Sequence, residues 1–228
     1  MITVNDLLNL DSASLVPRNP PCPPEPWEAL IMEYLVAMTT RVPDGTPEQA
    51  VSDVRAREAA RSRELAAQRH LRRLWRPPLR PGEWRTLGLF TAPDDDELEK
   101  VLASMPLRVW RSDEVTPLAP HPNDPVPPPA PGPPEFLTTF ALTIPEGTPQ
   151  QVADDTIARE AQSARALAGQ GRLLRLWRLP TGDALGLWRA RDAAEMHAIM
   201  ESLPLYAWMT VRTTPLTPHP SDPVAARS

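Results

Sequence analysis

The sequence has a single cysteine, Cys22, in 228 residues. One cysteine excludes an internal disulfide and any zinc site built from cysteines. Cys22 stands inside the run Pro-Pro-Cys-Pro-Pro with no histidine beside it, so the sequence favours a loop residue over a nucleophile. A chain with so little cysteine fits a reducing compartment, and we expect a cytoplasmic protein.

Long apolar runs and free basic clusters are also missing. No stretch approaches the roughly 18 apolar residues of a membrane span, and residues 1–15 lack the features of a signal peptide. The formal net charge is −5, which argues against a nucleic-acid partner. No glycine-rich phosphate loop, Ser-His-Asp order or metal-ligand spacing is present. We therefore expect a soluble protein with no nucleic-acid partner, no membrane contact and no metal.

Proline is abundant and unevenly placed. Six of the 31 prolines fall in residues 17–26 and nine in residues 120–134. Such density blocks helices and central strands and favours extended connections. The predicted organisation is a Pro-rich extension (1–32), a first repeat (33–125), a Pro-rich linker (126–134), a second repeat (135–223) and a short tail (224–228).

An internal repeat organises the chain. Residues 46–76 recur at 148–178 with the same Thr-Pro start, Ala-Arg-Glu centre and Leu-Trp-Arg end. Each copy predicts a long helix (46–69 and 148–170) that begins at an N-cap threonine, followed by proline at the first helical position and a capping-box glutamine, Gln49 or Gln151. The helical period puts Glu58 and Glu160 in the middle of the stripe that should be buried.

Each repeat predicts four strands and two helices. The expected strands are 33–42, 71–76, 84–91 and 107–116, and in the second copy 135–144, 173–178, 184–190 and 205–214. A second helix, capped by Asp94–Asp96 or Asp192, precedes each last strand. This β-α-β-β-α-β order is ferredoxin-like, with both helices on one side of an antiparallel sheet. Because the other sheet face is unfavourable in water, the two copies should cover each other. The predicted fold is α+β: two ferredoxin-like repeats forming a pseudo-dimeric barrel.

Several of these motifs together resemble the muconolactone Δ-isomerases. They are the Ala-Arg-Glu helix, the Leu-Trp-Arg strand, the Ser-x-Pro-Leu turns at 104–107 and 202–205, and the His-Pro-x-Asp tails at 121–124 and 219–222. Each repeat corresponds to one whole subunit, so the resemblance covers about 180 of the 228 residues. It implies an α+β barrel of paired ferredoxin-like units, a homo-oligomer, and a cofactor-free 1,3-proton shift in an unsaturated lactone that bears a carboxylate.

The resemblance and the repeat pattern nominate a set of site residues. Glu58 and Glu160 are the candidate catalytic groups, because burial raises the pKa of a carboxyl toward the range that enolisation needs. A glutamate that reaches the helix edge or pairs with an arginine one turn away is the alternative. The candidate substrate-binding residues are cationic or aromatic, although aromatic residues in such a pattern belong to a core more often than to a ligand site: Arg55, Arg73, Arg175, Trp75, Trp177, Trp110, Tyr206 and Trp208.

The predicted function is a cofactor-independent isomerase or cyclase that moves a proton in a small unsaturated lactone or carbonyl compound. A ligand-binding or assembly module that keeps the barrel without the chemistry is an alternative, and so is a cofactor-free monooxygenase on the same fold. The repeats differ, since Arg55 of the first is matched by Ile157 of the second. One competent pocket with a supporting half, or one site in each half, both agree with the sequence.

Overall fold

The computed structural model describes residues 31–126, 130, 132 and 134–224. Cys22, nearly all of the N-terminal extension, most of the linker and the last four residues lie outside the described part. The first half consists of β1 (Met32–Thr40), α1 (Glu48–Ala67), β2 (Leu71–Arg76), β3 (Arg85–Ala92), α2 (Asp95–Ala103), η3 (Pro106–Trp110) and β4 (Arg111–Pro120). The second half consists of β5 (Glu135–Leu142), α3 (Gln150–Gly169), β6 (Leu173–Arg178), β7 (Ala184–Arg189), α4 (Ala193–Glu201), η4 (Tyr206–Trp208) and β8 (Met209–Pro218).

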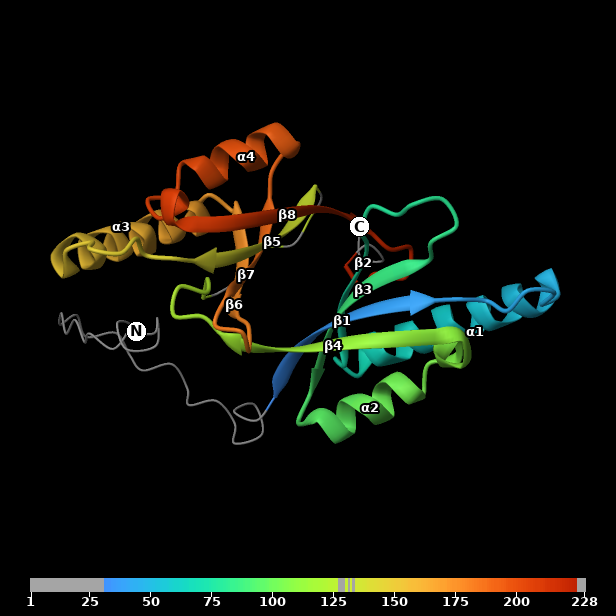
Figure 1. Ribbon diagram of the computed structural model, residues 1–228. Helices are drawn as coiled ribbons and strands as arrows, with labels where there is room; N and C mark the ends of the chain where they lie inside the picture. Colours follow the sequence, from blue (N-terminus) through green and yellow to red (C-terminus); the bar gives the residue numbers. More distant parts are fainter. Residues whose placement is uncertain (1–30, 127–129, 131, 133, 225–228) are drawn as a thin grey trace.

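The strands close into one barrel in the order β1-β3-β2-β8-β5-β7-β6-β4. Each half contributes a ferredoxin-like sheet of antiparallel pairs, β4-β1-β3-β2 or β8-β5-β7-β6. The halves meet at two short seams of two residue pairs each, β2 with β8 and β4 with β6. The helices lie outside the barrel, α1 and α2 against one half and α3 and α4 against the other (Figure 1). The predicted α+β pseudo-dimeric barrel is confirmed.

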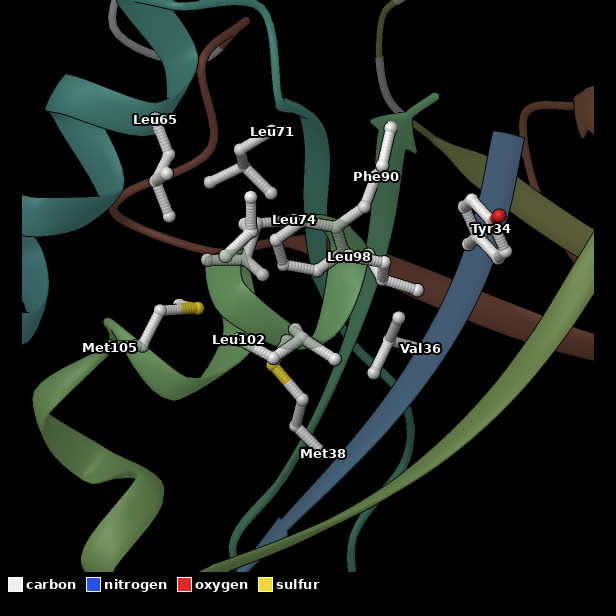
Figure 2. Close-up of a cluster of buried hydrophobic side chains, with 12 residues drawn as sticks. Tyr34, Val36, Met38, Leu65, Leu71, Leu74, Phe90, Leu98, Leu102 and Met105 are labelled. Carbon is white, nitrogen blue, oxygen red and sulfur yellow. The ribbon is translucent and has the colours of Figure 1, made fainter. Parts of the chain in front are cut away.

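The apolar residues form three layers. Inside the barrel, both halves contribute buried leucines and the two matched tryptophans, Trp75 and Trp177. Each half also packs its helices on the outer face of its sheet. Figure 2 shows this layer in the first half, where side chains from the sheet, α1 and α2 point toward one another. None of the helices in the described part of the chain is long and apolar enough to cross a membrane.

The start of each long helix differs from the prediction. Helix α1 begins at Glu48 with Pro47 as its cap residue, and no side chain caps it. The Thr46 hydroxyl instead donates to the carbonyl of Pro43 at 2.7 Å, which closes the preceding turn. Gln49 donates to Asp53 one turn along the helix. The predicted capping box is therefore wrong in α1, and α3 repeats the same arrangement with Thr148 and Pro145.

The last strand of each half begins later than predicted. The residues after the Ser-x-Pro-Leu turn form a short 3-10 segment, η3 or η4, before the strand starts at Arg111 or Met209. Proline at the start of η3 favours this turn because its φ is already fixed near the helical value. The shift matters for the site, since it brings the backbone of Leu107 and Leu205 over the long helices.

Two matched ion clusters tie the halves together. In the Arg73 cluster, Arg73 forms a bidentate pair with Glu135 (2.7 and 2.9 Å) and also bonds Asp222. The Trp75 indole N–H donates to Glu135 at 2.7 Å. The Arg175 cluster repeats these contacts with Glu33, Asp124 and Trp177. Because every arginine and its carboxylates come from opposite halves, the clusters fix how the halves meet.

Candidate active site

A cavity of about 340 Å³ lies in the first half, between α1 and the sheet. Its walls come from β1, α1, β2, β3, the 3-10 turn, β4 and the C-terminal tail of the second repeat: Met38, Thr40, Arg55, Glu58, Ala59, Ser62, Leu74, Arg76, Trp84, Thr86, Met105, Leu107, Arg111, His219, Pro220 and Ser221. Its apolar end adjoins the helix–sheet core, since Met38, Leu74 and Met105 belong to both (Figure 2). Such a volume suits a small organic molecule.

Glu58 is the carboxylate of this cavity. The backbone N–H of Leu107 donates to its Oε2 at 2.8 Å, and Arg111 donates to its Oε1 at 3.2 Å. Its side chain is 13% exposed. The Ser-x-Pro-Leu turn therefore orients the glutamate, which gives this sequence motif a physical role beside the helix.

Burial raises the pKa of Glu58 above its ordinary value. The Leu107 N–H and the Arg111 guanidinium favour the charged carboxylate and oppose this rise, whereas the nearby Asp113 adds to it. Arg111 is itself held by Asp113, at 2.7 and 3.0 Å. Glu58 thus combines a fixed position with a raised pKa, and both properties suit a group that takes up and returns a proton.

Cationic and aromatic groups flank the glutamate. The guanidinium of Arg55 lies over the ring of Trp84 at 4.4 Å, which orients this side chain one helical turn before Glu58. Arg76 lines the same cavity. Neither Arg55 nor Arg76 has a carboxylate partner among residues 31–126, 130, 132 and 134–224, so both are available to an anionic ligand.

The equivalent region of the second half is more apolar. Glu160 keeps its position, since the Leu205 N–H donates to it at 3.0 Å and burial raises its pKa. Its surroundings differ: five polar or charged lining residues, Thr40, Arg55, Ser62, Thr86 and Arg111, are matched by Leu142, Ile157, Ala164, Ala184 and Met209, whereas Arg76 and His219 keep polar counterparts in Arg178 and His121. Of these, Ala164, Ala184 and Met209 pack in the hydrophobic cluster of that half with Phe140 and Trp188. In the described part of the chain, Glu160 therefore has no cation at hydrogen-bond distance.

The structure brings only two of the nominated residues to the cavity, Glu58 and Arg55. Arg73 and Arg175 lie in the ion clusters, where carboxylates occupy their guanidinium groups, and Trp75 and Trp177 lie in the barrel interior. The remaining three lie half-buried in the 3-10 segments: Trp110, Tyr206 and Trp208.

Several functional residues of the cavity were not nominated by the sequence, among them Arg111, Trp84 and His219. Arg111 breaks the match between repeats, since Met209 stands in its place, and that mismatch is the signal that points to it. Trp84 likewise has no aromatic counterpart in the shorter turn at 179–183. His219 is in a motif present in both tails, so nothing in the sequence places it in the first half. Among the described residues, no three metal-ligating side chains come together.

The fold is an α+β barrel built from two ferredoxin-like units, with a cavity in its first half that suits a small organic molecule. The family model described as muconolactone delta-isomerase matches residues 32–124 and again 135–222. The chain therefore belongs to the muconolactone delta-isomerase family, as a tandem member. The predicted resemblance and the predicted enzyme class, an isomerase, are confirmed.

Individual relatives agree with the family. Muconolactone Delta-isomerase 1 of Acinetobacter lwoffii is 37% identical over 88 residues, 38% of this chain and 92% of that protein. Muconolactone Delta-isomerase of Cupriavidus pinatubonensis is 34% identical over 92 residues, 40% of this chain and 97% of that protein. One relative thus matches about one repeat of this chain.

Solved structures share the barrel. Chlorite dismutase from Candidatus Nitrospira defluvii aligns with a TM-score of 0.57 at 10% identity, covering 86% of this chain and 94% of that one. A heme-binding protein from Thermus thermophilus aligns with a TM-score of 0.52 at 14% identity, over 86% of this chain and 94% of that one. At such identities the likeness concerns the fold alone.

Proposed function

We propose that the first half catalyses a cofactor-independent 1,3-proton shift on a small unsaturated lactone that carries a carboxylate, with Glu58 as the proton carrier. The observation that carries this proposal is Glu58 itself: a carboxylate with a raised pKa, fixed in a cavity by Leu107 and Arg111. The relatives in the family act, by their names, on muconolactone.

The chemistry needs one base that works twice. The Glu58 carboxylate takes a proton from the saturated carbon beside the conjugated carbonyl system. The C–H bond breaks, an O–H bond forms on Glu58, and the electron pair spreads to the carbonyl oxygen as a dienolate. Glu58 then returns the proton to the carbon two positions away, and the double bond moves between them. Both steps balance without an oxidant or a metal.

The arginines that line the cavity beside Glu58, Arg55 and Arg76, favour a substrate that carries a negative charge. Arg55, held over Trp84, is the proposed partner for the substrate carboxylate, because a guanidinium binds a carboxylate in a planar, bidentate manner.

The proposal assigns the reaction to the first half alone. Glu160 of the second half lacks counterparts of Arg55 and Arg111, since Ile157 and Met209 stand in their places beside an apolar cluster. A substrate carboxylate would lose its hydration there without gaining these two ionic partners. We propose that the second half is a supporting half that closes the barrel.

A pair of matched variants tests the proposal. Purified protein is incubated with muconolactone and with a panel of substituted unsaturated lactone acids, and the double-bond shift is followed by proton NMR. Glu58→Gln is expected to lower kcat about 10²–10⁴-fold, since it removes the proton carrier but keeps the size of the side chain. Glu160→Gln, the matched control, is expected to leave kcat within about twofold, and ligand binding should saturate at one molecule per chain.

Other outcomes would reject parts of the proposal. Equal losses in both variants, with two ligands per chain, would indicate a site in each half. Turnover that is insensitive to Glu58→Gln would remove glutamate catalysis altogether. Tight binding of a lactone acid without any turnover would favour the ligand-binding module.

A further inference from the structure

His219 reaches the cavity from the other half of the molecule. It lies in the C-terminal tail of the second repeat, and it lines the cavity together with Pro220 and Ser221. Hydrogen bonds hold the tail to the first half at two points. The backbone N–H of His219 donates to the carbonyl of Leu74 at 2.9 Å. The Asp222 carboxylate accepts from the backbone N–H of Leu74 and from Arg73. These contacts fix the backbone of His219 beside β2.

The hydrogen bonds of the tail determine the tautomer of the ring. The backbone N–H of Ser221 donates to Nδ1 of His219 at 3.1 Å. An Nδ1 that accepts carries no proton, so the proton of the neutral ring is on Nε2. Within the described residues Nε2 has no hydrogen-bond partner. One N–H donor is thus left for a molecule in the cavity.

The surroundings keep this ring neutral. Burial lowers the pKa of His219 to about 4, and the nearby Arg76 and Arg55 contribute to the lowering by repelling a second positive charge. The other titratable groups that line the cavity are Glu58 and Arg111. At neutral pH the ring therefore donates through Nε2–H without competing with Glu58 as a base.

We propose that His219 is a further catalytic residue, whose Nε2–H donates a hydrogen bond to the carbonyl oxygen on which negative charge develops when Glu58 removes the substrate proton. The inference rests on the proposed function of the cavity. A preorganised neutral donor at that oxygen stabilises the dienolate more than the lactone, since the oxygen gains charge only as the proton leaves. The active site would then be incomplete without the tail of the second repeat.

Two variants at one position separate the donor from the turn. His219→Asn keeps a polar atom near Nδ1 for the Ser221 N–H but has nothing at the place of Nε2, whereas His219→Gln puts an amide NH₂ close to that place. We expect His219→Asn to lower kcat about 10²-fold with KM within about threefold, as for the loss of one oxyanion donor. His219→Gln should recover at least about tenfold of that loss, because its amide restores a donor.

His121 supplies the matched control. It has the same tail motif in the second half, its Nδ1 accepts from Asn123 at 3.1 Å, and its pKa is likewise lowered to about 4. It is not among the residues that line the cavity. His121→Asn should therefore leave kcat unchanged while imposing a comparable change on the fold, which thermal unfolding of both variants would measure.

The outcomes distinguish this inference from the proposed function. If Glu58→Gln abolishes turnover while His219→Asn and His121→Asn behave alike, the donor role of His219 is wrong and the glutamate mechanism stands. Equal kcat for His219→Asn and His219→Gln would also overturn it, since a purely structural histidine gives no rescue by the donor. If Glu58→Gln retains activity, the proposed function fails first. The pH of the acidic limb of the kcat profile should be the same in wild type and His219→Asn, because the variant leaves the contacts of Glu58 in place.

Discussion

The two halves share one scaffold and differ in what surrounds the same glutamate. Glu58 and Glu160 both accept a backbone N–H from the turn after the second helix, and burial raises the pKa of both. Among the described residues, only Glu58 of the two has an arginine at hydrogen-bond distance, Arg111, where the second half has Met209. The fold therefore determines the position of the carboxylate in both halves, whereas a few side chains determine whether a polar cavity surrounds it.

The ion clusters give a second comparison. In the Arg73 cluster the side chains of Arg73, Glu135 and Asp222 are 7%, 0% and 1% exposed. In the Arg175 cluster the matched side chains of Arg175, Glu33 and Asp124 are 23%, 22% and 15% exposed. The bidentate arginine–glutamate pair and the tryptophan N–H bond are the same in both clusters, so the main difference between them is the access of water. Solvent weakens an ion pair and lowers the cost of breaking it.

The largest expected effect is the loss of stability when the arginine of each ion cluster is replaced in turn. Arg73→Met leaves two buried carboxylates without a cation and is expected to lower the free energy of unfolding by about 3–5 kcal/mol. Arg175→Met leaves carboxylates that water reaches, and the expected loss is about 1 kcal/mol. Urea unfolding of the two variants measures both values. Equal losses would show that burial does not separate the clusters.

A smaller effect concerns the difference at Arg111. Arg111→Met copies the second half into the first and removes a charge that favours the ionised form of Glu58, while Asp113 remains. The pKa of Glu58 should therefore rise further. Since the base works only when deprotonated, the acidic limb of the pH–kcat profile should move to higher pH, with the plateau at high pH little changed. Arg111→Lys keeps the charge and should keep the limb near the wild-type pH; a limb that does not move in Arg111→Met would contradict this account.

The smallest expected effect lies in the core of the second half. Trp188 is buried, its indole N–H has no hydrogen-bond partner in the described part of the chain, and the matched residue of the first half is Phe90. Trp188→Phe removes an unsatisfied donor and should raise the free energy of unfolding by about 1 kcal/mol, as measured by urea unfolding. Phe90→Trp, the converse change, should lower it. A loss of stability in Trp188→Phe would mean that ring volume outweighs the unsatisfied N–H.

The fold could be predicted because the sequence patterns that determine it are local and occur in both repeats. The strand and helix periods, the proline clusters and the Ala-Arg-Glu and Leu-Trp-Arg motifs recur in both copies, and each copy has an open sheet face that the other can cover. The predictions were wrong at Thr46 and at the 3-10 segments because two local conformations compete at each of these places. In one, the threonine hydroxyl bonds a turn carbonyl instead of the helix. In the other, the chain after Pro106 makes one more turn before extending.

The site was predicted less completely because its contacts are distant in the chain. Arg73 was expected to hold substrate, but its partners Glu135 and Asp222 lie 62 and 149 residues away, and no local pattern reveals them. His219 belongs to one repeat and lines the cavity of the other. Glu58 and Arg55 could be found because a helical turn brings them together on one helix. Whether a cavity remains around them depends on side-chain volumes such as Phe140 against Met38, which periodicity does not report.

The covalent joining of the halves has an evolutionary consequence. In a pair of identical subunits every substitution appears on both sides of the two-fold axis, so an arginine placed beside one glutamate is placed beside both. Here the tail that carries His219 and the strand that carries Arg111 are encoded separately from their counterparts, His121 and Met209. Duplication within one chain thus removes the requirement that both halves change together. The residues around one glutamate can be substituted while the other half keeps the residues that close the barrel.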